Sequence, residues 1–258
     1  MRVITLLSDF GLRDWFVPSM KGVILGITPH ARIVDVTHEI PAQDVQAGAF
    51  VLAAAARAFP KGTIHVAVVD PGVGSSRRAI AVHTGAAIFL GPDNGLLSLA
   101  VPDGRGIEMR SLENERYFRQ PVSRTFHGRD VFAPVAAHLA KGVKFDSLGP
   151  KVASMQRLAA RVSIASPGEV RGEIIYVDRF GNLISNITAG QVRAVPGAQV
   201  TVGKRRVGPV CWSYSDVPPG QAVAVLNSLD LLEIGVRDGD AARAWRARCG
   251  TPLRVVRR

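Results

Sequence analysis

The stretch VAVVDPGVGSSRRAIAV, residues 66–82, places an acid and two cations where they could act on one another. An apolar run ends in Asp70, and Arg77 and Arg78 follow after two glycines and two serines. Either guanidinium can fold back and neutralise the carboxylate, because Gly72 and Gly74 let the backbone turn sharply and let a ligand lie close. Two interpretations stay open here: an ion pair that closes a loop, or part of a reactive site.

A second polar cluster lies in the stretch RTFHGRDVFAP. His127 precedes a predicted helix, and the dipole at a helix start favours the neutral imidazole. A neutral ring suits a general base or a hydrogen-bond partner, although a surface or capping histidine fits the same pattern. His127 is therefore a candidate acid–base residue.

Acidic and polar residues also follow three predicted strands, as Ser8-Asp9, Thr37-His38-Glu39 and Asp70. The carboxyl ends of parallel strands meet at one edge of an α/β sheet, and ligands bind there. Each acid alone could be a turn residue. Together they predict that three acidic loops converge on one site.

Strand-like and helix-like segments alternate in the N-terminal part of the chain, which must position these loops. Predicted strands cover Val3–Leu7, Arg32–Val36, Ile64–Val69, Ala79–His83 and Ala87–Leu90, and predicted helices cover Trp15–Ile27 (capped by Asp14), Asp44–Phe59 and Asp130–Lys141. This order predicts an α/β domain with a mostly parallel sheet covered by helices.

After Ser166-Pro167-Gly168 the pattern changes to short alternating strands separated by turn residues. Predicted strands cover Arg171–Val177, Leu183–Ile187, Gln199–Val202, Ala222–Leu226 and Leu231–Val236. Such a pattern is typical of a small antiparallel β-barrel or sandwich. We expect two domains, an α/β domain at residues 1–163 and a β-barrel domain at residues 164–258.

Charge distribution and motif content disfavour nucleic-acid binding and the common nucleotide-binding loops. The net charge of +11 could suit nucleic acid, but the arginines are scattered and no recognisable nucleic-acid module is present, which disfavours that partner. Gly72-Val73-Gly74 lacks the third glycine of a dinucleotide fingerprint, and no Walker A lysine is present.

Membrane, secretory and metal-binding functions are also disfavoured. The longest apolar run, Ala47–Ala56, is about half of a membrane-spanning helix, and the opening MRVITLLSDFG is unlike a signal peptide. Cys211 and Cys249 are too few for a disulfide framework or a zinc site. We expect a cytoplasmic protein without a metal.

Seven stretches resemble, in order and spacing, the S-adenosylmethionine hydroxide adenosyltransferases, a family related to the fluorinating and chlorinating adenosyltransferases. They are LLSDFGLRD, VDVTHEIPAQDVQAGAFVLAAA, VVDPGVGSSRR, GPDNGLLS, TFHGRDVFAP, VDRFGNLISNI and NSLDLLEIGV. The resemblance implies an α/β domain followed by a β-barrel. It also implies a homotrimer whose active sites lie between the N-terminal domain of one subunit and the C-terminal domain of the next.

The resemblance implies attack of water or hydroxide on C5′ of S-adenosyl-L-methionine, releasing adenosine and L-methionine, with no further cofactor. The family's catalytic residues fall on Asp70, Arg77 and His127. Asp70 and His127 would orient the water and accept its proton, and Arg77 would stabilise hydroxide character. Which residue takes the proton does not follow from the sequence.

The substrate-binding residues that the resemblance implies are spread over the whole chain. Asp9 would accept hydrogen bonds from the ribose hydroxyls, Asp14 would lie near the methionine, and Asp178 would face the methionine amino group. The others are Phe180 and Asn182 beside methionine or adenine, Ser228 at the methionine carboxylate, Glu233 in the last binding motif, and Val236 near adenine.

Three departures affect substrate packing. Asn227-Ser228-Leu229-Asp230 replaces the usual Asn-Ser-Ser-Gly, Arg237 follows Val236 in place of Asn, and Gln43 replaces an aromatic residue. The halide-using relatives carry a non-acidic residue where Asp70 stands, which favours hydroxide here. The alternatives are a halide-dependent adenosyltransferase and a protein that binds S-adenosylmethionine or adenosine without turnover.

Overall fold

The computed structural model describes residues 2–104 and 106–258. Its contacts divide the chain into two compact units, Met1–Leu158 and Ala159–Arg258. The domain boundary predicted between residues 163 and 164 lies immediately ahead of strand β7 (Ile164–Ser166). Each unit has a hydrophobic core of its own.

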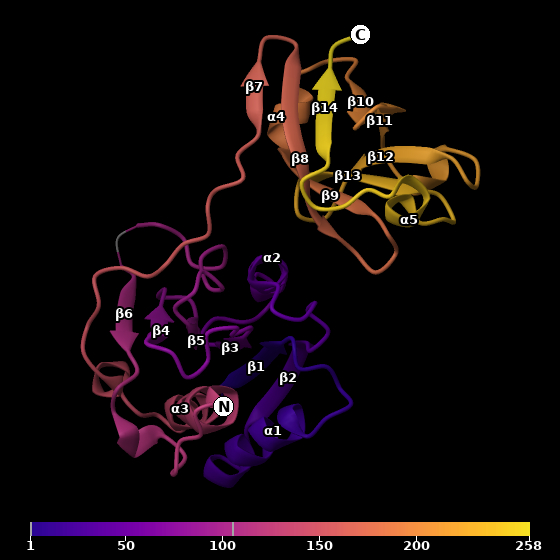
Figure 1. The fold of residues 1–258 in the computed structure, drawn as a ribbon. Coiled ribbons are helices and arrows are strands. Elements are labelled where there is room, and N and C mark those ends of the chain that lie inside the picture. The colour runs from indigo at the N-terminus through magenta and orange to yellow at the C-terminus, as the bar shows by residue number, and fades with distance from the viewer. Residues whose placement is uncertain (1, 105) are drawn as a thin grey trace. The chain divides into compact units, whose positions relative to one another are not determined.

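Within residues 2–104 and 106–158, six strands form one sheet in the order β2-β1-β3-β5-β4-β6 (Figure 1). Their bounds are β1 (Val3–Ser8), β2 (Arg32–Thr37), β3 (Ile64–Val68), β4 (Ala79–His83), β5 (Ile88–Pro92) and β6 (Glu108–Ser111). The pairs β2–β1, β1–β3 and β3–β5 are parallel, whereas β4 is antiparallel to both of its neighbours. The predicted α/β class with a mostly parallel sheet is confirmed.

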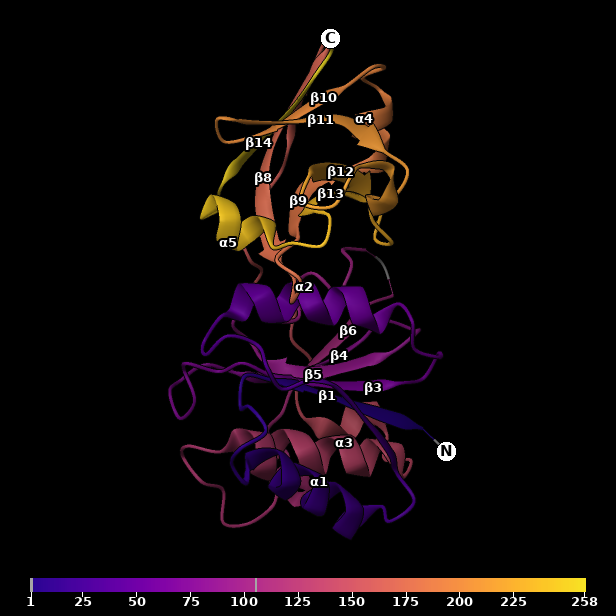
Figure 2. The same cartoon turned by 90° about the vertical axis from the view of Figure 1, so that its right-hand side faces the viewer.

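Helices cover both faces of this sheet. α2 (Val45–Ala56) lies on one face, and α1 (Phe16–Ile27) and α3 (Ala133–Ala140) lie together on the other (Figure 2). α1 buries Val17, Met20 and Ile24, the three- and four-residue spacing of a helix with one apolar face. Short helical turns η1 (Glu115–Tyr117), η2 (Gly128–Phe132) and η3 (Phe145–Leu148) complete the unit.

Two predicted helix starts are wrong. Asp14 does not cap α1, because Trp15 is the N-cap residue, no side chain caps this helix, and Asp14 is exposed. The third helix does not begin at Asp130, because Gly128–Phe132 first forms a π-helical turn that leads into α3. Asp130 is fully buried there, where its carboxylate has partners other than a helix end.

Seven strands of residues 159–258 close into a barrel in the order β14-β10-β11-β12-β13-β9-β8, and the pairing of β8 with β14 completes the ring. Their bounds are β8 (Glu169–Val177), β9 (Leu183–Thr188), β10 (Gln199–Val202), β11 (Arg205–Cys211), β12 (Ala222–Leu226), β13 (Leu231–Val236) and β14 (Pro252–Val256). β11 and β12 are parallel, and the other neighbours are antiparallel. The predicted small β-barrel is confirmed.

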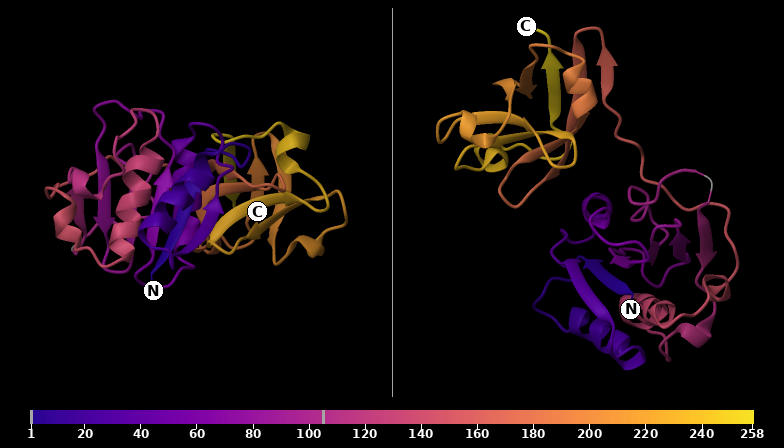
Figure 3. Two further views of the ribbon diagram at one scale, coloured as in Figure 1. Left: turned by 90° about the horizontal axis from the view of Figure 1, so that it is seen from below. Right: turned by 180° about the vertical axis from the view of Figure 1, so that it is seen from behind.

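Strand β7 pairs only with β8, so it lies outside the ring (Figures 1 and 3). The helices α4 (Ala189–Arg193) and α5 (Ala241–Trp245) and the turn η4 (Tyr214–Asp216) occur in the connections between strands. Alternate residues point inward, as in β14, where Leu253 and Val255 are buried and Arg254 is exposed.

Candidate active site

Asp70, Arg77 and His127 form one hydrogen-bonded array in the N-terminal unit. Arg77 Nε donates to Asp70 Oδ1 at 3.0 Å, and Arg77 Nη2 donates to Asp70 Oδ2. The same Nη2 lies 2.8 Å from His127 Nδ1. The side chains of Arg77 and Asp70 are 9% and 5% exposed, so water screens this bidentate pair only weakly.

This geometry fixes the protonation state of His127. A guanidinium can only donate, so Nδ1 must accept and the ring proton is on Nε2. Burial lowers the pKa of His127 below its ordinary value of 6.5, and the charge of Arg77 lowers it further, against the opposing charges of Asp70 and Asp130. His127 is therefore a neutral ring whose Nε2 is a donor.

The loop after β3 turns at Gly74, which adopts φ +78°. A Cβ at this position would collide with the carbonyl oxygen of Arg124, three residues before His127. Only glycine therefore lets the loop that carries Asp70 and Arg77 pack against the loop that carries His127.

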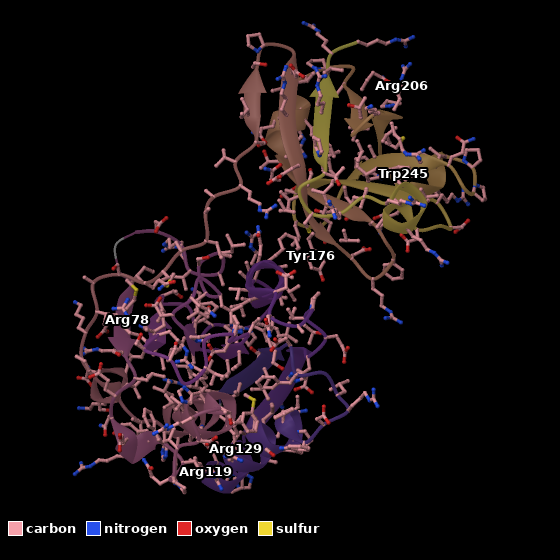
Figure 4. The ribbon with its side chains drawn as sticks, viewed as in Figure 1. Arg78, Arg119, Arg129, Tyr176, Arg206 and Trp245 are labelled. Carbon is pink, nitrogen blue, oxygen red and sulfur yellow. The ribbon has the colours of Figure 1, made fainter. Side chains whose placement is uncertain are left out.

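The two adjacent arginines have separate partners. Arg78, labelled in Figure 4, donates from Nε to Asp93 Oδ2 at 2.9 Å and from Nη2 to the carbonyl oxygen of Ser154 at 2.9 Å. The neighbouring Asn94 donates from Nδ2 to the carbonyl oxygen of Val69 at 2.9 Å. The GPDNG stretch, residues 91–95, thus holds the end of β3 in place. Of the two arginines, it is Arg77 that folds back on Asp70.

Asp130 is a buried anchor of the loop that carries His127, and sequence reasoning missed this role. Arg119 and Arg129, which lie close together in Figure 4, both donate to its Oδ1, at 3.2 and 2.7 Å. The backbone N–H of Ser123 donates to Oδ2 at 2.9 Å. Burial alone would raise the pKa of Asp130, but the bonds from Arg129 and Ser123 lower it below its usual value.

A cavity of about 360 Å³ opens over the array in the N-terminal unit. It is lined by Asp9, Phe10, Phe16, Gln43, Val68, Asp70, Pro71, Val73, Thr125, Phe126, His127 and Gly128. Of the three acidic loops expected at one site, those of Asp9 and Asp70 line this cavity. Glu39 is exposed and is not among the lining residues, whereas His38 is buried.

A second cavity, of about 860 Å³, lies in the C-terminal unit. Its lining includes the six site residues predicted in this part of the chain, which are Asp178, Phe180, Asn182, Ser228, Glu233 and Val236. Trp212, Tyr214 and Asn227 also line it, and sequence reasoning did not select them. The aromatic residues of the CWSYSD stretch, just after β11, were the available signal.

Two carboxylates in this second cavity are held by hydrogen bonds. Glu233 is buried and accepts from the Tyr214 hydroxyl and from Asn227 Nδ2, the latter at 3.0 Å. Burial and then Glu233 raise the pKa of Tyr214 well above its usual range, so the phenol keeps its proton and donates. Asp178 accepts from Asn182 through the backbone N–H at 2.8 Å and through Nδ2 at 3.0 Å.

Of the predicted site residues, Asp14 and Arg77 are not among the lining residues of either cavity. Arg77 still reaches the site through its bonds to Asp70 and His127, whereas Asp14 is exposed. No cluster of His, Cys, Asp or Glu among the described residues could hold a metal ion. In the same residues, no helix combines the length and the apolar character needed to cross a membrane.

Residues 4–149 match the N-terminal domain of the SAM hydroxide adenosyltransferases, and residues 172–254 match the C-terminal domain of the same family. The chain is 42% identical to the (R)-S-adenosyl-L-methionine hydrolase of Thermus thermophilus, over 99% of this chain and 100% of that one. It is 30% identical to a fluorinase of an Actinoplanes species, over 99% and 97% of the two chains.

Among solved structures, a conserved protein of Thermotoga maritima superposes with a TM-score of 0.91 at 35% identity, over 98% of this chain and 100% of that one. Both units of the chain thus have counterparts in one relative.

Proposed function

Since this chain belongs to the S-adenosylmethionine hydroxide adenosyltransferase family, we propose that it hydrolyses S-adenosyl-L-methionine to adenosine and L-methionine. Water attacks C5′ of the adenosyl group, the C5′–S bond breaks, and its electron pair leaves with the methionine sulfur. One proton is released. The observation that carries this proposal is the hydrogen-bonded array of Asp70, Arg77 and His127, of which Asp70 and His127 line the first cavity.

The sulfonium is already an excellent leaving group, so the protein's task is to prepare the water. Holding a nucleophile in line behind C5′ can supply about 7 kcal/mol or more of the barrier. A positioned base adds roughly 10²–10⁴-fold in rate. Both effects need side chains that are fixed before substrate arrives, and the Arg77 bonds to Asp70 and His127 provide that.

The tautomer of His127 determines which residue of the array orients the water and which accepts its proton. Because Nδ1 accepts from Arg77, the imidazole offers the Nε2–H to the water and orients its oxygen. Asp70 keeps lone pairs beyond those that Arg77 occupies, so its carboxylate accepts the water proton. Arg77 stabilises the hydroxide character that develops on the oxygen.

The remaining residues bind the substrate. Asp9 accepts hydrogen bonds from the ribose hydroxyls at the first cavity. Asp178 faces the methionine amino group and Ser228 the carboxylate, both at the second cavity. Carboxylates in both cavities suit a substrate that carries a sulfonium and an ammonium.

The name of the Thermus thermophilus relative specifies the (R) epimer at sulfur, and we extend that preference to this protein. Incubation with each epimer, followed by chromatography of adenosine and methionine, tests it. Faster consumption of the (S) epimer would contradict the preference but not the reaction.

Two cavities on two units also support a homotrimer in which each site is shared by neighbouring subunits. Mixing tests this arrangement: at substrate concentrations far below KM, Asp70→Ala and Asp178→Ala subunits each lose most of their activity alone, but co-assembly restores intact sites if they lie between subunits. Sedimentation of the wild type gives the number of subunits. No recovery of activity in co-assembled trimers would place the whole site within one chain.

The decisive experiment identifies the source of the 5′ oxygen in the adenosine product. In H₂¹⁸O the adenosine product gains the label at its 5′ oxygen, and Asp70→Ala reduces turnover while circular dichroism shows a retained fold. Turnover that requires chloride or fluoride and gives a 5′-halogenated nucleoside would instead support the halide alternative. Tight binding of S-adenosylmethionine without adenosine release would support a binding protein.

A further inference from the structure

His38 is a buried histidine that the reaction above does not use. It is 2% exposed and directly follows β2, the strand that pairs with β1. Its Nδ1 lies 2.7 Å from Ser8 Oγ, and Ser8, which is 0% exposed, directly precedes Asp9. We infer that His38 and Ser8 are positioning residues that hold the Asp9 carboxylate in place for the ribose diol.

Four hydrogen bonds join the loop after β1 to the loop after β2. Besides the bond between Ser8 and His38, Gly11 N donates to the carbonyl oxygen of His38 at 2.7 Å, and Ile40 N donates to that of Ser8 at 3.4 Å. Gln43 N donates to Asp9 Oδ2 at 2.8 Å. The Asp9 carboxylate is therefore held by the same loop that His38 anchors.

The polar groups around His38 form a chain from Phe10 to Asp35 in which every donor points the same way. Nε2 lies 3.1 Å from Asp35 Oδ1, although too poorly aligned for a regular hydrogen bond, and Asp35 Oδ2 accepts from Lys21 at 2.5 Å. A carboxylate at that distance favours the proton on Nε2, so Nδ1 accepts from the Ser8 hydroxyl. Ser8 Oγ can then accept from the Phe10 N–H, 3.3 Å away.

One oxygen of Asp9 is committed to the Gln43 backbone, and Gln43 itself has φ +65°. A non-glycine residue in this left-handed region is held there by its surroundings. The bonds from Ser8 and His38 supply that constraint, because they fix both loops on either side of the Asp9–Gln43 contact. Loosening them lets the carboxylate rotate away from the cavity without altering Asp70, Arg77 or His127.

The same unit contains a matched control. His65 of β3 is 1% exposed, and its Nδ1 lies 2.8 Å from the hydroxyl of Thr5, which lies on β1 three residues before Ser8. Neither Thr5 nor His65 lines the cavity. The two pairs have the same chemistry and burial, but only one adjoins Asp9.

The test measures the ratio of dissociation constants for 2′,3′-dideoxyadenosine and adenosine by calorimetry, because only adenosine offers the diol. This inference rests on the proposed function, in which Asp9 binds that diol. Wild type is expected to prefer adenosine by tenfold or more, as for hydrogen bonds to a charged group, and Asp9→Asn to lose most of this preference.

His38→Ala and Ser8→Ala should reduce the preference at least fivefold, with a matching rise in KM for S-adenosylmethionine and a smaller change in kcat. His38→Asn, which keeps a polar atom near the Nδ1 position, should recover part of it. His65→Asn and Thr5→Val should retain the wild-type ratio even where they lower the melting temperature.

An unchanged ratio in folded His38→Ala and Ser8→Ala would overturn the inference while leaving the proposed function intact. An equal loss of the adenosine preference in the His65→Asn control would overturn it too, because the effect would then come from a general loosening of the N-terminal unit. A wild-type protein that binds both nucleosides equally would remove the ribose role of Asp9, and the inference with it.

Discussion

The two cavities differ in how their polar side chains are held. In the first, Asp70 and Arg77 are 5% and 9% exposed, and each is hydrogen-bonded to another member of the array. In the second, Trp212 and Phe180 are 95% and 74% exposed, and the carboxylates are paired with neutral groups such as Tyr214 and Asn182. We therefore propose that the first cavity acts on the bond that breaks and that the second recognises the substrate.

The first prediction concerns the array, where the largest loss is expected. Asp70→Ala should reduce kcat by about 10³-fold, within the range for removing a positioned base, and should leave KM within a few-fold of wild type. Adenosine release measured by chromatography gives both constants. A variant that raises KM while kcat stays high would show that the first cavity binds and the second reacts.

Glu233→Gln tests the second cavity. The change keeps the shape but removes the charge that accepts from Tyr214 and Asn227. KM should rise about tenfold, which corresponds to about 1.4 kcal/mol, while kcat changes little. Steady-state kinetics separate the two effects, with Glu173→Gln as a control on a partly exposed carboxylate outside either cavity lining. A fall in kcat alone would contradict the division between the cavities.

The pH profile tests the state of His127. Its pKa is lowered, so its neutral form persists below pH 6.5 and is lost only as pH falls through the lower, folded-state pKa. The acid limb of kcat should therefore lie below pH 6.5. Arg77→Gln removes a charge that lowers this pKa, so the His127 titration followed by NMR should move upward. A shift downward, or an acid limb above pH 6.5 in wild type, would contradict the neutral donor role.

Much of this arrangement could be predicted from the sequence because its signals are local. Apolar runs that end in Asp9 and Asp70 marked two strands, and the glycines between Asp70 and Arg77 marked a turn. Periodicity could not choose between Arg77 and Arg78, which are adjacent in the chain but bond to different carboxylates. That choice depends on where Asp93 lies in the folded sheet.

Other features were missed because tertiary contacts override local pattern. Strand β11 begins with Arg205-Arg206, and β6 reads Glu-Met-Arg-Ser, so neither is recognisable as an apolar strand. Asp130 lies three residues after His127 and directly precedes an apolar run, which is the pattern of a helix start. Its partner Arg119 lies eleven residues earlier, and only the fold brings them together.

Trp212→Ala should have the smallest effect, and it sharpens the contrast between the cavities. An indole that is 95% exposed makes few contacts within its own subunit, so the free energy of unfolding should change by less than about 0.5 kcal/mol. If the side chain contacts substrate or a neighbouring subunit, KM should rise a few-fold or the proposed trimer should dissociate at higher protein concentration. Denaturant melts, kinetics and sedimentation of one preparation measure all three. A large loss of stability with unchanged KM and assembly would mean that Trp212 supports the barrel, and that the second cavity is held as tightly as the first.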